Sequence, residues 1–360
     1  MKRPRCRWLG LTAWAFVASA CGAGGDSPLG DVRLIVVDSL GEDLSILSAD
    51  SPPVVQKAVV KVGKAPNQVL LDGAEAWVLS SQSNSLEVVD VTTWKVERQY
   101  ALGDGCNPYW MAQAGDGTLI VSCFLSNEIL RVDPRVAAGA SAVLSRLPMP
   151  TGVDLNPTDP QKPGFARPQG VAVVGNEVFV TLTNLGSDWA PAGPGFLLVA
   201  DLAAWVITRK VELPSRNPGF VYAERNGGRL FITASGDFSG NGAVEVYDVS
   251  ARALSGRVAL GGAPGRMCLA DDGRAYVGDQ LDGRVLSFDT QTLAAGDPQV
   301  LCPADFGAGI YDFVADVACA GSVRWAACFA TDKVHRLRTG EAPQAFEVGD
   351  GPVALAAVAP

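Results

Sequence analysis

The chain has 360 residues, more than a typical single domain, and 48% of them are hydrophobic, which is enough for a buried core. Its formal charge is −9, and the part after residue 20 carries −13, because residues 1–20 contain four basic side chains and no acidic one. A protein with this much negative charge repels phosphate backbones, which excludes nucleic-acid binding as its main activity.

Residues 1–20 are predicted to be an export signal. A basic start is followed by an apolar run from Trp8 to Val17, too short for a permanent membrane helix. The end of the run, Ala18-Ser19-Ala20-Cys21, resembles the lipobox of bacterial lipoproteins. That resemblance implies a lipid on Cys21, a flexible tether over 21–30 and an outer-membrane lipoprotein of the bacterial envelope. The alternative is ordinary cleavage, with Cys21 an incidental thiol.

Residues 31–360 are predicted to form one domain built from a repeated unit. The unit is clearest at 64–105, where short runs alternate apolar and polar residues and are divided by Asp72-Gly73, by 81–84 and by 90–93. Such alternation indicates half-buried antiparallel strands. Four strands in about 42 residues are typical of a propeller blade.

Two markers follow the unit along the chain. The first is a proline that opens each first strand, at positions 66, 108, 168, 218, 264 and 352, with a degenerate copy at 310–312. The second is an aspartate that ends the third strand and can cap the next turn, at positions 90, 133, 201, 248 and 289. Ser48 holds that place in the first copy and Arg338 in the last.

The two ends of the repeat are incomplete in complementary ways. Residues 33–63 provide only three strands, at 33–38, 44–48 and 54–62, and residues 352–359 provide one more. Pairing them completes the ring and covers exposed sheet edges. We therefore predict an all-β, seven-bladed β-propeller with four antiparallel strands per blade, the first blade closed by the C-terminal strand.

The repeat resembles the YVTN-type family of bacterial β-propellers. The resemblance lies in Ala76-Trp77-Val78-Leu79-Ser80, in the Asn-containing turn and strand from Asn84 to Asp90, and in Thr93-Trp94-Lys95-Val96. It extends over most of 31–360 and is poor over 310–351. It implies the fold and says little about activity, because propellers have many unrelated functions.

Six cysteines lie in the body of the chain, and an exported protein can form disulfides. Cys106 starts a first strand and Cys123 ends the adjacent second strand. Cys328 aligns with Cys123 in its own copy, and Cys302 lies just before that copy's first strand. We predict the pairs Cys106–Cys123 and Cys302–Cys328. Cys268 is expected to be a small buried hydrophobe, and the pairing of Cys268 and Cys319 stays open.

The candidate ligand site is the channel mouth. Residues that follow the marker prolines start the innermost strands, so their side chains should gather there. The candidates are Asn67, Gln68, Tyr109, Trp110, Gln169, Phe220, Arg266, Tyr311 and Asp312. Aromatic walls with a few polar groups are typical of a small-ligand or peptide pocket. The alternative is that Arg266 and Asp312 only pair to join two blades.

No cofactor is predicted apart from a candidate calcium loop. Asp237, Ser239 and Asn241 alternate as oxygen ligands around a glycine bend, which resembles the calcium loop of some propellers. An ordinary turn is the alternative, because Ser239 replaces a carboxylate. His335, the only histidine, is expected on the surface.

Long insertions at 146–165, 184–195 and 235–242 should all lie on one face, where propellers commonly bind ligands. We expect a monomeric, non-enzymatic recognition or assembly module that binds an envelope protein, peptide or glycan there and touches the membrane only through its lipid. The alternative is a metal-dependent, lactonase-like hydrolase with its site at the channel mouth. Asn67, Asn107 and Asp312 are few ligands for such a metal.

Overall fold

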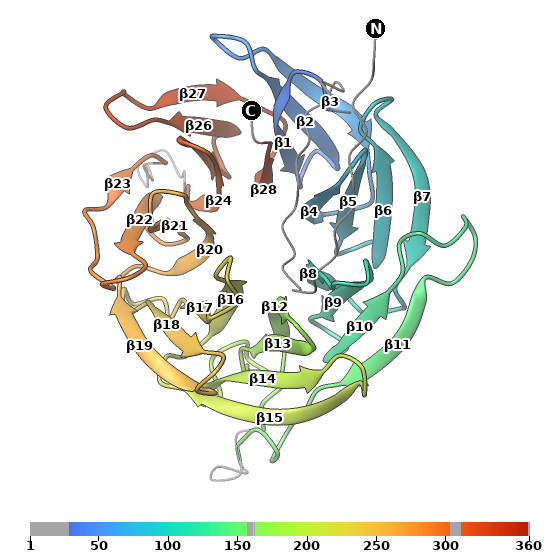
Figure 1. The fold of residues 1–360 in the computed structure, drawn as a ribbon, viewed down its shortest axis with the longest axis vertical. Helices are drawn as coiled ribbons and strands as arrows, with labels where there is room; N and C mark the ends of the chain where they lie inside the picture. The colour runs from blue at the N-terminus through green and yellow to red at the C-terminus, as the bar shows by residue number, and fades with distance from the viewer. Residues whose placement is uncertain (1–28, 157–160, 162, 303–310, 359–360) are drawn as a thin grey trace, which may run out of the picture.

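The computed structural model describes residues 29–156, 161, 163–302 and 311–358. They fold into seven four-stranded antiparallel sheets arranged in a ring around a central channel axis (Figure 1). The prediction of a seven-bladed β-propeller is confirmed. No helix within these described ranges is long and apolar enough to cross a membrane.

Each blade runs from an innermost to an outermost strand. The first blade consists of β28 (Pro352–Ala357), β1 (Val32–Asp38), β2 (Asp43–Ser48) and β3 (Val55–Lys61). The second consists of β4 (Pro66–Asp72), β5 (Glu75–Ser80), β6 (Ser85–Asp90) and β7 (Lys95–Ala101). The third consists of β8 (Pro108–Gln113), β9 (Leu119–Cys123), β10 (Glu128–Val132) and β11 (Val143–Pro148). The fourth consists of β12 (Pro168–Val174), β13 (Glu177–Leu182), β14 (Gly195–Asp201) and β15 (Val206–Leu213).

The remaining three blades follow the same order. The fifth consists of β16 (Pro218–Ala223), β17 (Arg229–Ala234), β18 (Ala243–Asp248) and β19 (Ala253–Ala259). The sixth consists of β20 (Pro264–Leu269), β21 (Arg274–Asp279), β22 (Arg284–Asp289) and β23 (Gln299–Val300). The seventh consists of β24 (Val314–Ala320), β25 (Val323–Cys328), β26 (Lys333–Leu337) and β27 (Gln344–Glu347).

The ring closes as predicted, by antiparallel pairing of β28 with β1. The register runs from Leu34 opposite Ala357 to Val37 opposite Ala354. The first blade therefore contains strands from both ends of the described chain. This pairing satisfies backbone groups along one edge of β1 that would otherwise lie open.

The recurring aspartates cap the turns that follow the third strands. Asp90 accepts hydrogen bonds through Oδ1 from the backbone N–H groups of Thr92 and Thr93, at 2.6 and 3.1 Å. Asp289 does the same for Gln291 and Thr292. The Thr92 hydroxyl also donates to Asp90, and together with the backbone bonds it favours the ionised carboxylate, so the pKa of both aspartates is lowered. The repeated residue thus has a local structural cause.

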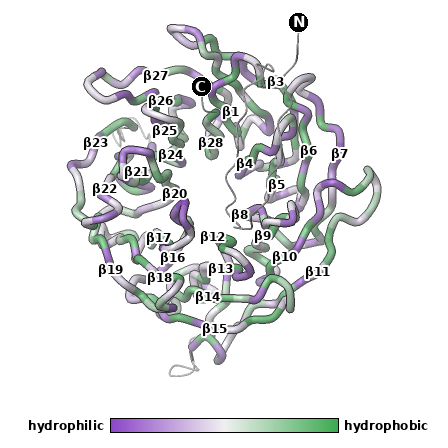
Figure 2. Tube along the Cα trace, in the orientation of Figure 1, coloured by the Kyte–Doolittle hydropathy of each residue, from purple (hydrophilic) through white to green (hydrophobic). Residues whose placement is uncertain are grey.

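The hydrophobic core is divided into seven clusters, one between each pair of neighbouring blades. Each cluster is built from alternate residues of the three inner strands. The outer rim is more polar, and much of β7 is coloured as hydrophilic in Figure 2. A propeller blade therefore depends on its neighbours for the burial of its apolar faces.

The ring has two distinct faces. The loop face carries the turns between second and third strands and the connections between blades, including 149–156, 163–167, 183–194 and 235–242. The hairpin face carries the turns between first and second strands and between third and fourth strands. The described parts of the three long insertions therefore lie on the same face, as predicted.

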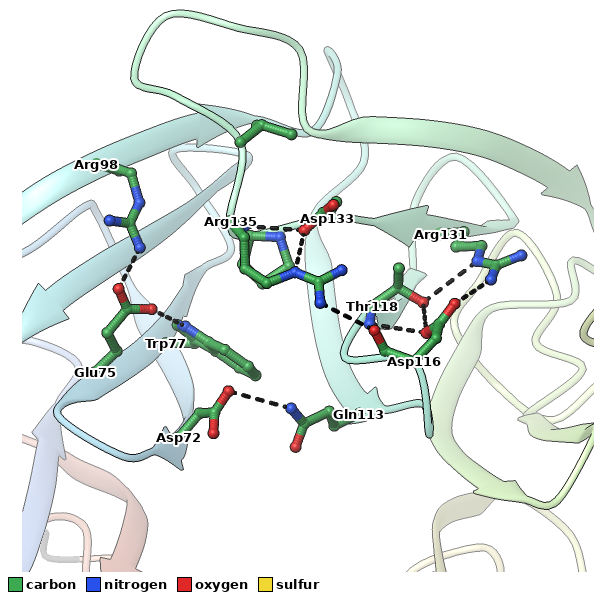
Figure 3. Close-up of polar contacts among 12 residues, drawn as sticks. Asp72, Glu75, Trp77, Arg98, Gln113, Asp116, Thr118, Arg131, Asp133 and Arg135 are labelled. Carbon is green, nitrogen blue, oxygen red and sulfur yellow. Dashed lines mark hydrogen bonds and ion pairs between the residues drawn. The ribbon is translucent and has the colours of Figure 1, made fainter.

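On the hairpin face, arginines at the junction of the second and third blades are matched by acids (Figure 3). Arg98 meets Glu75 and Arg131 meets Asp116. Arg135 lies 2.7 Å from Asp133. Opposite charges in contact stabilise each other and need no further partner.

Candidate functional site

The structure brings most of the predicted site residues together at the channel. Asn67 and Gln68 lie on β4, Tyr109 and Trp110 on β8, Gln169 on β12, Phe220 on β16 and Arg266 on β20. These are the innermost strands of five blades. The residues pack largely against one another, and Gln68, Phe220 and Arg266 are buried.

Arg266 reaches across the channel. It starts from the sixth blade and donates a hydrogen bond to the backbone carbonyl of Asn67 in the second blade. Its guanidinium carbon lies 5.1 Å from the ring centroid of Trp110 and 5.4 Å from that of Phe220. Only 5% of the residue is exposed. Cation–π contact with both rings offsets part of the cost of burying the charge.

The acid beside Arg266 is Asp316, which sequence reasoning missed, and not Asp312. Its Oδ2 lies 3.7 Å from Arg266 Nη1 and accepts the N–H of Leu355 at 2.8 Å. Burial raises the pKa of Asp316 to about 6, while the charge of Arg266 opposes the rise. The marker is degenerate in this copy and β24 begins only at Val314, so no sequence signal pointed to residue 316.

Asp312 has a structural role and does not pair with Arg266. It is fully buried, and its Oδ1 accepts the N–H of Ala330 at 2.8 Å while its Oδ2 accepts the hydroxyl of Thr331 at 2.7 Å. It therefore caps the turn between β25 and β26. Tyr311, by contrast, is exposed on the loop face, where its hydroxyl donates to the carbonyl of Gln280.

A cavity of about 220 Å³ lies deeper in the channel. Arg266, Asp316, Trp110 and Tyr222 line it. Tyr222 Oη accepts the N–H of Met267 at 3.0 Å, and burial raises its pKa. These groups already bond to one another or to backbone, so a ligand would have to displace existing contacts.

All six body cysteines form disulfides. Cys106–Cys123 and Cys302–Cys328 are confirmed. The expectation that Cys268 is an unpaired hydrophobe is wrong, because Cys268 is bonded to Cys319. This third bond joins β20 to β24, the innermost strands of two neighbouring blades. It crosses between repeat copies, so alignment of one copy with another could not reveal it.

A second cluster lies on the loop face and consists of Phe124, Phe165, Arg167 and Trp189. The Arg167 guanidinium carbon is 5.6, 4.8 and 4.7 Å from the three ring centroids, respectively. No acidic side chain in the described parts of the chain forms an ion pair with it, and its Nε is buried without a hydrogen-bond partner. Burial lowers the Arg167 pKa. We call this group the loop-face cluster.

The loop-face cluster is continuous with the channel mouth. Tyr109 lies 5.6 Å from Phe124 and 5.9 Å from Phe220, measured between ring centroids. The two predicted aromatic residues of the channel therefore connect to a surface that includes Trp189, of which 55% is exposed. Sequence analysis included Trp189 only as part of the 184–195 insertion and missed Arg167, which lies just before a marker proline.

All four exposed aromatic side chains among the described residues belong to the loop face. They are Phe165, Trp189, Phe238 and Tyr311. Exposed apolar Leu40 and Leu125 lie in turns on the same face. A concentration of exposed aromatic and apolar residues on one side marks an interaction surface.

The candidate metal-binding residues have other bonds here. Asp237 Oδ1 accepts the N–H of Ser239 at 3.0 Å, and Asn241 Oδ1 accepts the N–H of Asp237 at 3.1 Å, so the loop holds itself as a turn. Calcium binding stays a prediction. His335 is half-buried and not on the surface as expected, and burial lowers its pKa.

Comparison with known proteins shows the fold and no more. No family model and no curated protein sequence matches the chain. Hydrazine synthase of Kuenenia stuttgartiensis superposes with a TM-score of 0.68 at 18% identity, over 88% of this chain and 94% of that one.

Two further solved structures are similar to this chain in fold. Virginiamycin B lyase from Staphylococcus aureus gives a TM-score of 0.57 at 14% identity, over 78% of this chain and 84% of that one. The dihydro-heme d1 dehydrogenase NirN gives 0.57 at 15% identity, over 94% and 77%. These neighbours have unrelated names, and at such identity the likeness places the chain among β-propellers by fold alone.

Proposed function

We propose that the protein is an envelope-anchored recognition module that binds a protein or peptide ligand on its loop face. The observation that carries this proposal is the location of every exposed aromatic side chain of the described residues on that face. Lipid on Cys21, which lies outside the described residues, would hold the module at the membrane.

The chemistry of the loop-face cluster suits such a ligand. Exposed Trp and Phe side chains provide large, rigid contact areas, which are the usual anchors of protein interfaces. Arg167 adds a cation that no acid of the described chain neutralises. A ligand with apolar side chains and a carboxylate would therefore gain both ring contacts and a charge-assisted hydrogen bond.

The hydrolase alternative has less support from the geometry. Several structural neighbours bear enzyme names. In this channel, however, Asp316 faces Arg266, and Asp312 caps a turn. A chelator-sensitive, stoichiometric divalent metal in the purified protein would favour the hydrolase over the recognition module.

Site-specific photo-crosslinking in producing cells tests the proposal. A photoreactive residue at position 189 or 238 should give a discrete adduct, whereas one at Val206, equally exposed on an outer strand, should not. The adduct should weaken when Phe165→Ala and Arg167→Gln are combined with the probe at 238. Adducts only from position 206, or none from the loop face, would contradict the proposal.

A further inference from the structure

A cavity between two blades lies on the hairpin face, opposite the loop-face cluster. It has a volume of about 380 Å³ and sits between the seventh and the first blade. Arg336 and Arg338 line it from the seventh blade, and Arg33 lines it from the first. Trp325 forms an apolar wall, and Ser48 and Ser322 add hydroxyl groups. No acidic residue is in the lining, but the hydroxyl of the lining residue Ser48 donates to Asp50 Oδ2 at 2.6 Å.

The three arginines have only weak or neutral partners. Arg33 Nη1 donates to the backbone carbonyls of Gly30 and Val32, and Arg336 Nη2 donates to the amide oxygen of Gln344. Arg338 lies 3.9 Å from Glu341 in a pair that is about half exposed, and such pairs contribute little.

Comparison of the repeat copies shows that the basic lining of this pocket differs from the equivalent positions of the other blades. Five blades end their third strand with an aspartate, and the two blades beside this cavity have Ser48 and Arg338 at that position. Arg336 is equivalent in the repeat to Arg131 of the third blade. Arg131 meets the carboxylate of Asp116, as Figure 3 shows, whereas Arg336 meets an uncharged amide.

The electrostatics of the cavity favour an anion. Arg336 is only 7% exposed, and burial together with the nearby charge of Arg338 lowers its pKa. Removing such a cation from water without an opposite charge costs free energy, and a second cation beside it adds to the cost. An anion placed between the three guanidinium groups would remove both penalties.

We propose that this pocket binds a phosphate group. Planar guanidinium groups donate paired hydrogen bonds that fit phosphate oxygens, and a doubly charged phosphate neutralises three arginines better than one carboxylate does. The volume leaves room for an organic group against Trp325 and Val323.

Two sources could supply this phosphate. One is a soluble phosphorylated small molecule, and the other is the head group of an anionic phospholipid. Leu29 to Asp31, where the described chain begins, adjoin Arg33 on this face, since the Ala49 N–H donates to the Asp31 carbonyl. Cys21 lies 12 residues before Arg33 in the sequence, so a lipid on Cys21 is the reason to test lipid directly.

Two experiments test the two sources. The soluble source is tested by calorimetric titration of the full chain with sn-glycerol 3-phosphate. The lipid source is tested by sedimentation of the Cys21→Ala chain with phosphatidic acid vesicles. We expect saturable binding in at least one arm, with pure phosphatidylcholine vesicles inert. Arg33→Gln and Arg338→Gln should each weaken it about tenfold or more. Arg135→Gln, which removes an exposed arginine from the same face, should change it less than about twofold.

The results of the two binding experiments distinguish the two sources of the phosphate. Binding of vesicles alone assigns a lipid head group, and binding of glycerol phosphate alone assigns a soluble ligand. Thermal melting of each variant shows whether the fold is intact. A double variant, Arg33→Lys with Arg338→Lys, keeps the positive charges and should retain part of the affinity. Absence of binding in both arms, or equal binding by the Arg33→Gln and Arg338→Gln chains, overturns the proposal.

Discussion

At the scale of residues, the first blade contains an unusual pair of buried carboxyl groups. Asp38 and Asp43 lie opposite each other in the β1–β2 ladder, and each has an Oδ1 that is buried without a hydrogen-bond partner. In the sixth blade, the corresponding pair is Asp279 and Arg284, which lie 2.7 Å apart. Asp43 Oδ2 pairs with Lys61 Nζ at 2.7 Å, so a proton on Asp38 leaves no negative charge of the two carboxyl groups without a partner.

This pair predicts a stability that falls as pH rises. Burial, with a contribution from Asp43, raises the pKa of Asp38 to about 8, far above the value of an unfolded aspartate. The folded state therefore binds the proton more tightly, so the stabilisation is complete below about pH 4 and is lost progressively up to about pH 8. Denaturant unfolding at pH 5, 7 and 9 measures this loss of stability.

The matched variant is Asp38→Asn, which keeps the shape and stays neutral. Relative to this variant, the free energy of unfolding of the natural chain should fall by up to about 1.4 kcal/mol per pH unit between pH 5 and 8. Parallel pH profiles for the two proteins would show that Asp38 is already ionised.

Arg266 gives a second prediction at this scale. Because it is buried beside Asp316, Arg266→Met should leave that carboxylate without its cation and lower the free energy of unfolding by about 3 kcal/mol. Adding Asp316→Asn should recover most of the loss, since the uncompensated charge disappears. Urea unfolding of the two single variants and the double variant measures the coupling, and additive effects would rule out a pair interaction.

At the scale of elements, β28 is the strand on which the ring depends. It forms the innermost strand of the first blade, and its Ala354 and Leu355 belong to the two apolar clusters on either side of that blade. The Leu355 N–H also donates to Asp316 across the boundary with the seventh blade. One short strand therefore connects both termini and the buried charges of the channel.

Deleting residues 352–360 should abolish cooperative unfolding and cause aggregation. The deletion exposes the edge of β1 and the apolar faces of two blades, and such edges pair with other chains. Calorimetry and size-exclusion chromatography measure this. Removing only Ala359 and Pro360, which keeps β28 whole, is the control and should leave both measurements unchanged. A compact, cooperatively folding 1–351 chain would argue against closure by β28.

At the scale of the whole molecule, the two faces have different chemistry. The loop face presents aromatic side chains around Arg167, and the hairpin face holds the pocket with three arginines. The ligand proposed for each face is reached from a different side of a rigid ring. A membrane anchor on the tether could therefore hold the protein while the loop face stays available to a partner.

The anchor itself is testable by one substitution. Cys21→Ala removes the thiol that lipid attachment needs, so the protein should move from the detergent-extracted membrane fraction to the soluble fraction of the envelope. Cys6→Ala, which changes the other cysteine of the first 28 residues, should not alter the distribution. Membrane association that survives Cys21→Ala would count against lipidation.

Much of the architecture could be predicted from sequence because the repeat is local. Period-2 alternation set the strands, so the expected 33–38 and 44–48 agree with β1 and β2 within one residue. Counting the incomplete copies predicted the closing strand. The adjacency of two strands predicted Cys106–Cys123, and aligning Cys328 with Cys123 predicted Cys302–Cys328, because equivalent positions in a repeat occupy equivalent places.

Only the tertiary structure decided which residues meet between blades. Cys268 and Cys319 are 51 residues apart, and Arg266 reaches Asn67 across the ring from 199 residues away. Likewise, Arg33 reaches the pocket of Arg336 only because the ring closes. Alternation along a strand determines which face a side chain takes, but contacts around the axis depend on how seven twisted sheets pack and on which charges that packing buries.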